Sequence, residues 1–266
     1  MTQSTLIGVL TNAILNDGRG SARATVLRHR HEQVCNLILL IIPSITTNIG
    51  EIIKKENGRT SAVTVEVMGY KGEDQIVPQS RHHVQRWSEV MQRADRSVTL
   101  IDLCGHEKYL KTTVFGLTAM LPDYAILVVG SNMGVQRMTK EHISIACALR
   151  IPMAVCVTKV DICPLPVLKQ TRQTIAKCLR ANGKMPYPVK DITQAETAAD
   201  SIVSDRVVPV FAMSSVTGQG VDLLRTFVNR LRRTARLQNA ANDPDVVYDN
   251  TPDVYFPIDG VYEVRG

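Results

Sequence analysis

The sequence lacks any long apolar stretch. No run of apolar residues exceeds six, and one such run, Leu37 to Ile42, is bounded by Asn36 and Pro43. This is well short of the roughly 18 residues that cross a bilayer. The first 15 residues contain no Lys or Arg ahead of an apolar segment, so they do not resemble a secretory signal. We therefore expect no membrane partner and a cytoplasmic location.

The six cysteines include no Cys-x-x-Cys pair. Their spacing argues against a zinc site and against a disulfide framework. Several lie within apolar runs, as reduced and buried thiols of a cytosolic protein do. Their positions are 35, 104, 147, 156, 163 and 178.

Length and composition predict a folded chain of one large domain, or one domain and a fragment. Its 266 residues correspond to about 1.8 domains of roughly 150 residues. Apolar residues make up 44% of the chain, which excludes disorder throughout. The net charge is 31 − 25 = +6, and the sequence contains no internal repeat.

Segments typical of strands alternate with segments of helical spacing. The strand-like segments, rich in β-branched residues, are 63–70, 97–103, 124–130, 153–159 and 207–213, and those from 124 onward are nearly continuous apolar runs. Such runs are typical of parallel strands with helices on both faces. The helix-like segments are 4–15, 108–121, 138–149, 165–181 and 221–237. We therefore expect an α/β fold with a mostly parallel sheet, whose ligands bind at the carboxyl ends of the strands.

The composition changes after Leu237. Residues 238–254 read as a linker, because they begin with polar residues and are rich in acidic side chains. The final 255–266 segment is aromatic and β-branched, and it is typical of a first strand of another domain. We therefore predict a main domain over residues 1–237.

A motif for recognising guanine follows one predicted strand. In Thr158-Lys-Val-Asp161, the Asp161 carboxylate can accept hydrogen bonds from the ring N–H and the exocyclic amino group of guanine. Adenine does not offer that pattern of donors, so Asp161 disfavours an ATPase. The aliphatic stem of Lys159 can cover the base. Taken alone, four residues could equally be a solvated loop at the end of a strand.

A second motif, Asp102-Leu-Cys-Gly105-His106, also follows a strand directly. In a nucleotide hydrolase, an Asp here holds a Mg²⁺ water and the Gly N–H approaches the γ-phosphate. His106 then stands where it could orient the attacking water, although an isolated histidine is more often structural. A third motif, Met213-Ser-Ser-Val216, follows another strand, where backbone N–H groups can meet the guanine carbonyl. Three such motifs at strand ends together favour a guanine-nucleotide site.

The chain resembles the eukaryotic GTP-binding protein one and two family, relatives of elongation factors Tu and 1-alpha. The resemblance covers about residues 4–237 and rests on long strings: Asp102 to Gly116, Thr139-Lys-Glu-His142, Thr158-Lys-Val-Asp161 and Asn16-Asp-Gly-Arg-Gly20. It implies a P-loop NTPase-type G domain that hydrolyses GTP with Mg²⁺, with ribosome and transfer or messenger RNA as candidate partners. It also implies that residues 255–266 open a β-barrel domain that is otherwise missing.

The resemblance assigns a role to each site residue. Ser4, Thr60 and Asp102 would hold Mg²⁺ or its waters, and His106 would position the nucleophilic water. The nucleotide-binding set is Ser4, Thr5, Asp102, Gly105, Thr158, Lys159, Asp161, Ser214, Ser215 and Val216.

The chain departs from the family at its start. Ser4 and Thr5 match the end of the phosphate loop, but Gln3 stands at the position of its Lys, and the glycine-rich turn and preceding strand are absent. Because that strand is central, its loss would leave a slot of roughly 9.5 Å in the sheet. The loss of this strand would remove apolar burial that stabilises the fold by on the order of 10 kcal/mol. We therefore predict that the isolated chain folds poorly. We predict weak or no GTP binding, and the alternative function is a catalytically dead binding module.

The second departure is the inserted apolar segment 34–55. Without these 22 residues, His31-Glu32-Gln33 would join the Gly58-Arg59-Thr60 switch at the family's spacing. Val codons begin with GT and a Lys codon can end in AG, so the segment could be a retained intron in a gene model, with upstream exons left out. A genuine apolar strand or hairpin remains the alternative. The segment could also fill the central slot, although its place after the first helix argues against that connection.

Two basic clusters could meet ribosomal or transfer RNA phosphates. The first is Arg19, Arg23, Arg28, His29, Arg30 and His31, and the second is Arg225, Arg230, Arg232, Arg233 and Arg236. For the second cluster a solvated helix face is the favoured interpretation.

Overall fold

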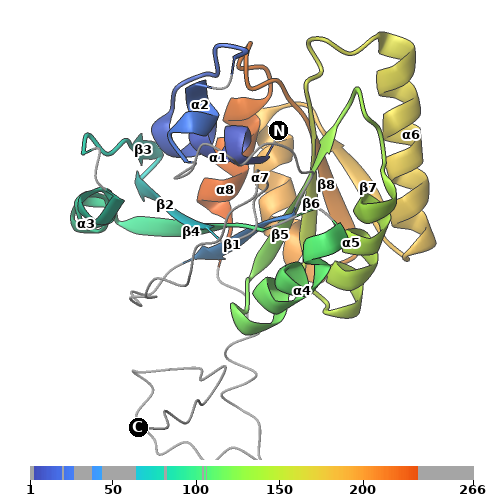
Figure 1. Cartoon of the computed structure of the whole chain (residues 1–266), viewed down its shortest axis with the longest axis horizontal. Helices are drawn as coiled ribbons and strands as arrows, with labels where there is room; N and C mark the ends of the chain where they lie inside the picture. Colours follow the sequence, from blue (N-terminus) through green and yellow to red (C-terminus); the bar gives the residue numbers. More distant parts are fainter. Residues whose placement is uncertain are drawn as a thin grey trace, which may run out of the picture.

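The computed structural model describes residues 3–19, 21–26, 38–43, 64–80, 83–103, 105 and 107–232, and the structural statements below concern these residues. Their strands form one sheet of eight (Figure 1). In spatial order these are β3 (Asp74–Ile76), β2 (Thr64–Lys71), β4 (Arg96–Asp102), β1 (Ile38–Pro43), β5 (Tyr124–Gly130), β6 (Met153–Thr158), β8 (Val207–Ala212) and β7 (Met185–Val189). Within this part of the chain, all strands except β1 and β2 run in the same direction. The predicted α/β class with a mostly parallel sheet is confirmed.

Helices cover both faces of the sheet (Figure 1). One face packs against α1 (Gln3–Asn12), α7 (Ile192–Ser201) and α8 (Val221–Arg230), and the other against α4 (Leu110–Ala119), α5 (Arg137–Ala148) and α6 (Leu165–Ala181). The shorter or peripheral helices are α2 (Ser21–Ala24) and α3 (His83–Arg93), and 3₁₀ turns span Glu107–Tyr109 and Ile202–Ser204. None of the helices in the described ranges is both long and apolar enough to cross a membrane.

The most buried helix is α1. Its side chains Leu6, Ile7 and Leu10 are fully buried in the core beneath α2 and α8. Close packing with α2 requires a glycine, since a Cβ on Gly8 would lie 1.8 Å from the carbonyl oxygen of Ala22. The start of α1, and with it Ser4, is therefore fixed against the sheet.

The central slot of the sheet is filled, contrary to our expectation that it would be empty. β1, from the inserted segment, lies between β4 and β5 and is antiparallel to both, with Leu40 opposite Ile101 and Ala125. The objection to this placement assumed a parallel strand, which needs a crossover of fixed hand. An antiparallel strand needs no such crossover. The premise for predicting poor folding is therefore wrong.

The structure differs from the predicted elements in two further respects: one helix is shorter, and several elements were not predicted. Helix α8 ends at Arg230 rather than at Leu237, and Leu231 and Arg232 continue in non-helical backbone. The sequence pattern did not predict the edge strands β3 and β7 or the helices α2, α3 and α7. The strand β7 contains Pro186 and Pro188. Prolines argue against a strand in a sequence pattern, but an edge strand tolerates them.

Breaking β1 should destabilise the whole domain, because both of its neighbours depend on it for backbone hydrogen bonds. We expect Leu40→Pro to lower the free energy of unfolding by about 3 kcal/mol or more, as measured by urea denaturation. Leu165→Pro is the matched control, since Leu165 is 80% exposed at the first position of α6, where proline is tolerated. Deletion of residues 34–55 should likewise abolish cooperative unfolding. A deletion variant as stable as the parent would show that the slot strand is dispensable.

Acid should destabilise the domain through His142 on α5. Its side chain is 1% exposed, and its Nε2 has no hydrogen-bond partner in the described part. Burial lowers the pKa of His142 to about 4. Since the pKa in the unfolded chain is about 6.5, the unfolded state binds more protons between these values. Stability is therefore full above about pH 6.5 and is lost as the pH falls towards 4, by about 3 kcal/mol in total.

The variant His142→Leu tests this prediction. Denaturation between pH 7 and pH 4 should show a shallower loss of stability for this variant than for the parent, because no imidazole remains to be protonated. Glu141→Gln, at the exposed neighbouring position, should leave the parent's profile in this range largely intact. Identical pH profiles for the parent and His142→Leu would contradict the prediction.

Candidate functional site

The candidate site lies along the edge of the sheet where β4, β5, β6 and β8 end. These strands all run in the same direction, so the residues that follow them reach one edge. Asp102 ends β4, Ser131 follows β5, Lys159 follows β6 and Met213 follows β8. The start of α1 meets the same edge through Ser4, which contacts Asp102.

Ser4 and Asp102 form the tightest contact between predicted site residues. The Ser4 hydroxyl donates to Oδ2 of Asp102 at 2.8 Å, and the two residues are 8% and 2% exposed. Thr5 is also buried beside Ser4, and Gly105 is buried beyond β4. A hydroxyl and a carboxylate are the hard oxygen donors that Mg²⁺ prefers. The residues present therefore fit the predicted metal site, although they are 98 positions apart in the sequence.

The ends of β5 and β6 are joined by a buried hydrogen-bond network around Ser131. Its N–H donates to the carbonyl of Thr158 at 2.9 Å, and its hydroxyl donates to the carbonyl of Lys159 at 2.9 Å. Thr171 of α6 donates to the carbonyl of Ser131 at 3.1 Å. This network holds the backbone of Lys159 in a left-handed conformation with φ +60°, which an L-residue rarely adopts without support.

The side chains of Lys159 and Asp161 are more accessible than the buried network around Ser131. Lys159 is half-buried, and Asp161 is exposed. Within the described part of the chain, the Asp161 carboxylate makes no hydrogen bond or ion pair. The N–H of Val160, between them, donates to the carbonyl of Met213 at 3.4 Å. The predicted base-binding loop is thus tied to the loop that follows β8.

The loop after β8 is folded around Ser214. This residue is fully buried, and its hydroxyl accepts hydrogen bonds from the N–H groups of Val216 and Thr217, each at 3.2 Å. The N–H of Ser215 donates to no group among the described residues. Gly220 at φ +72° closes the loop, where a Cβ would lie 2.3 Å from the carbonyl oxygen of Ala212. The backbone donor of Ser215 is therefore available to a ligand.

The Asn16 segment reaches this loop from the end of α1. The Asn16 N–H donates to the carbonyl of Ser215 at 2.8 Å, and the Asn16 side chain accepts from the N–H of Ala22 at 3.3 Å. Leu15 lies against Gly218, with its Cδ1 3.2 Å from where a Cβ would stand. The string that begins at Asn16 is therefore joined to the predicted base loop.

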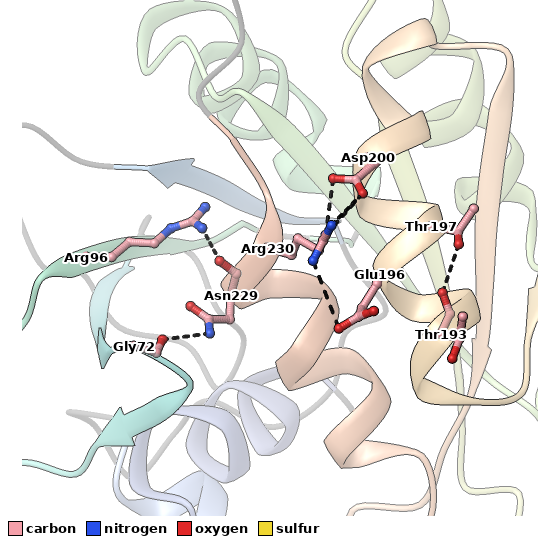
Figure 2. Close-up of polar contacts among 8 residues, drawn as sticks. All are labelled: Gly72, Arg96, Thr193, Glu196, Thr197, Asp200, Asn229 and Arg230. Carbon is pink, nitrogen blue, oxygen red and sulfur yellow. Dashed lines mark hydrogen bonds and ion pairs between the residues drawn. The ribbon is translucent and has the colours of Figure 1, made fainter.

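Helix α8, which follows the Ser214 loop, is fixed on two sides (Figure 2). Arg230 pairs with Asp200 of α7 at 2.9 Å, and this bond lowers the pKa of Asp200. Asn229 donates to the carbonyl of Gly72 at 3.1 Å, and Arg96 donates to the carbonyl of Asn229. These contacts hold α8 between α7 and the β2–β3 turn.

Two arginines of the second basic cluster form ion pairs within the fold. Arg230 is paired with Asp200, and Arg225 pairs with Asp222 at 3.3 Å and is mostly buried. Arg233 and Arg236 lie outside the described residues, as do residues 28–31 of the first cluster. The favoured interpretation of a solvated helix face fits Arg230, which is exposed, but not Arg225, which is mostly buried.

Two predicted site residues, Thr60 for the metal and His106 for catalysis, lie outside the described residues. One contributor to the site was missed: Ser131 orders the Lys159 backbone, yet it was not among the candidates. The signal was present, because Ser131 is a polar residue directly after the apolar run 124–130, as Asp102 and Lys159 are after theirs.

Comparisons with known proteins place the chain in a family. Residues 4–233 match the model of the elongation factor Tu GTP-binding domain. GTP-binding protein 1 of Xenopus laevis is 37% identical over 270 residues, covering 99% of this chain and 36% of that protein. GTP-binding protein 2 of Mus musculus is 34% identical over 265 residues, covering 98% of this chain and 39% of that protein. The chain thus spans less than two fifths of the length of these relatives.

Among solved structures, translation elongation factor SelB from Methanococcus maripaludis, in complex with the GTP analogue GppNHp, matches half of this chain. The identity is 25% and the TM-score 0.38, over 26% of the SelB chain. The sequence relatives confirm the resemblance to GTP-binding proteins 1 and 2. The chain belongs to the elongation factor Tu GTP-binding domain family.

Proposed function

We propose that this protein is an elongation factor-like GTPase that binds GTP and GDP with Mg²⁺ and hydrolyses GTP to GDP and phosphate. The observation that carries the proposal is the buried contact between Ser4 and Asp102 at 2.8 Å. It joins the start of the first helix to the end of a central strand, where a nucleotide hydrolase needs its metal ligands.

Recognition of guanine would fall to the loops after β6 and β8. Asp161, exposed and unpaired within the described part, would accept from the ring N–H and exocyclic amino group of guanine. The stem of Lys159 would cover the base, with Thr158 beneath it, and the Ser215 N–H would donate to the guanine carbonyl. The buried hydroxyl of Ser214 fixes this loop and orients Val216, so the donor is in place before the ligand binds.

The metal would be held by Ser4, Asp102 and Thr60, and when bound it would neutralise charge on the phosphates. Thr5 and Gly105 would contact the phosphates. His106 would orient the attacking water by accepting a hydrogen bond from it. Thr60 precedes Thr64 by four positions, and Thr64 pairs with Asp102 across the sheet, so the chain returns to this edge just after Thr60.

The family assignment favours this function over the alternative of a non-hydrolysing binding module. Because relatives of this kind include a selenocysteine-specific elongation factor, the proposed setting is translation. The ribosome and transfer or messenger RNA are the proposed partners, and the cytoplasm is the proposed location.

We expect guanine selectivity to be measurable although Gln3 predicts weak phosphate binding. Since Gln3 supplies no charge for the phosphates, we expect the 266-residue chain to bind fluorescent GDP more weakly than the micromolar range. Unlabelled GDP should displace the probe at least tenfold better than ADP, and Asp161→Ala should abolish this preference. Asp191→Ala, at an exposed carboxylate after β7, should leave the preference unchanged. Equal competition by ADP and GDP in the parent would refute the assignment of Asp161.

A lysine at position 3 should strengthen nucleotide binding. Gln3 is the residue before Ser4 at the start of α1, and an ammonium group there could form a charge-assisted hydrogen bond to phosphate. Such bonds contribute about 1.5 kcal/mol or more, so Gln3→Lys should lower the Kd for GDP roughly tenfold while leaving guanosine binding unchanged. Gln3→Met, without charge, is the control. Equal gains for GDP and guanosine would show that position 3 does not face the phosphates.

A further inference from the structure

The stretch from Ile162 to Lys190 contains no acidic residue. It carries six Lys and Arg residues in 29 positions, and four of these lie on α6. The charge is therefore concentrated in one helix and its flank, and the proposed nucleotide chemistry uses none of it.

Four cations of α6 share one exposed face. They are Lys169, Arg172, Lys177 and Arg180, whereas the opposite side buries Leu168, Thr171, Ile175 and Leu179. At 100° per residue, the cations fall within an arc of about 140°, and they extend over roughly 16 Å of helix. We call this set the α6 basic face. In Figure 1, α6 lies at the outer margin of the described fold, with no other helix or strand outside it.

The α6 basic face is not neutralised by the fold. Among the described residues, none of its four cations takes part in an ion pair. In contrast, neighbouring Lys184 pairs with Asp205 at 2.7 Å and is mostly buried. Arg93, Arg225 and Arg230 elsewhere also have acidic partners. Four unpaired cations on one helix favour a partner of opposite charge.

We propose that the α6 basic face binds the phosphate backbone of RNA. Lys and Arg, together with the exposed amides of Gln170 and Gln173, offer the donors that contact phosphate oxygens. The face has no aromatic residue on which a base could stack, so binding does not depend on RNA sequence. A protein partner fits less well, because the centre of a protein interface needs aromatic or large apolar contacts.

The position of the face allows RNA and nucleotide to bind together. Helix α6 begins four residues after Asp161. The whole helix therefore follows the loop that would hold the base and is not part of it. The choice of RNA over DNA rests on the proposed translational function. The charge pattern itself requires only a polyanion with closely spaced phosphates.

A charge-matched pair of variants tests the proposal. One is the triple variant Arg172→Gln, Lys177→Gln and Arg180→Gln. The control is Lys71→Gln, Lys111→Gln and Arg150→Gln, at exposed positions on β2, on α4 and after α5. Each triple lowers the net charge of the chain from +6 to +3, so only the location of the lost charge differs.

Binding is measured by fluorescence anisotropy with a labelled 20-nucleotide single-stranded RNA of mixed sequence over a salt series. The α6 triple should lose at least about tenfold in affinity at low salt, and its salt dependence should fall by about 2 in log–log slope for three lost phosphate contacts. The control should lose less than threefold. Equal loss in both triples, or no loss in either, would overturn the proposal.

Two further readouts identify the partner and separate this proposal from the nucleotide assignment. If polyglutamate of equal length bound as tightly as RNA and with the same dependence on the α6 triple, the face would serve an acidic protein and the RNA proposal would fail. GDP-over-ADP preference is measured in the same variants and should be unchanged. If the parent showed no preference for GDP over ADP but still bound RNA, only the proposed GTPase function would be refuted.

Discussion

The fold depends on how the facing edges of β4 and β5 satisfy their backbone hydrogen bonds. An unpaired backbone donor or acceptor inside a sheet costs about as much as a lost hydrogen bond, and two strand edges face each other here. The strand β1 satisfies both, in register with Asp102 on one side and Ile126 on the other at Leu39. A segment that interrupts the family's sequence spacing therefore completes the sheet.

Completion of the sheet determines the geometry of the candidate site. With β1 in place, β4 is held two strand positions from β5 and ends at Asp102. Helix α1 packs over this part of the sheet through fully buried Leu6 and Leu10, which brings Ser4 within 2.8 Å of the carboxylate. Collapse of the slot would move β4 relative to α1 and part these two groups. The loops after β6 and β8, which would hold the base, are positioned by the parallel strands beyond β5. We therefore expect them to be less sensitive than the Ser4–Asp102 contact to changes in β1.

The sequence predicted the elements whose pattern arises from burial on both faces. Strand β5 and helix α6 were predicted with their observed bounds, because a continuous apolar run and a clear 3.6-residue period mark them. The position of β1 was considered in the sequence analysis but disfavoured, because the objection assumed a parallel strand and the observed strand is antiparallel to both neighbours. Ser131 was missed although it directly follows an apolar run, because its role is to bond to the backbone of Lys159 and a serine at a strand end does not by itself identify that partner. The meeting of Ser4 with Asp102 was expected only from the family resemblance, because Ser4 begins a helix and follows no predicted strand.

If the proposed function holds, the charges of the site would couple the binding of metal to the binding of nucleotide. Asp102 is 2% exposed and ends β4 at the strand edge where the proposal places the phosphates, so without a cation two like charges would approach in a poorly screened environment. Gln3 brings no positive charge to offset them, and the cations of α6 lie on another surface. The guanine base, in contrast, would in the proposed function be recognised by Asp161 through neutral donors. Affinity for the base should therefore be independent of Mg²⁺, whereas the contribution of the phosphates should appear only when the metal is present.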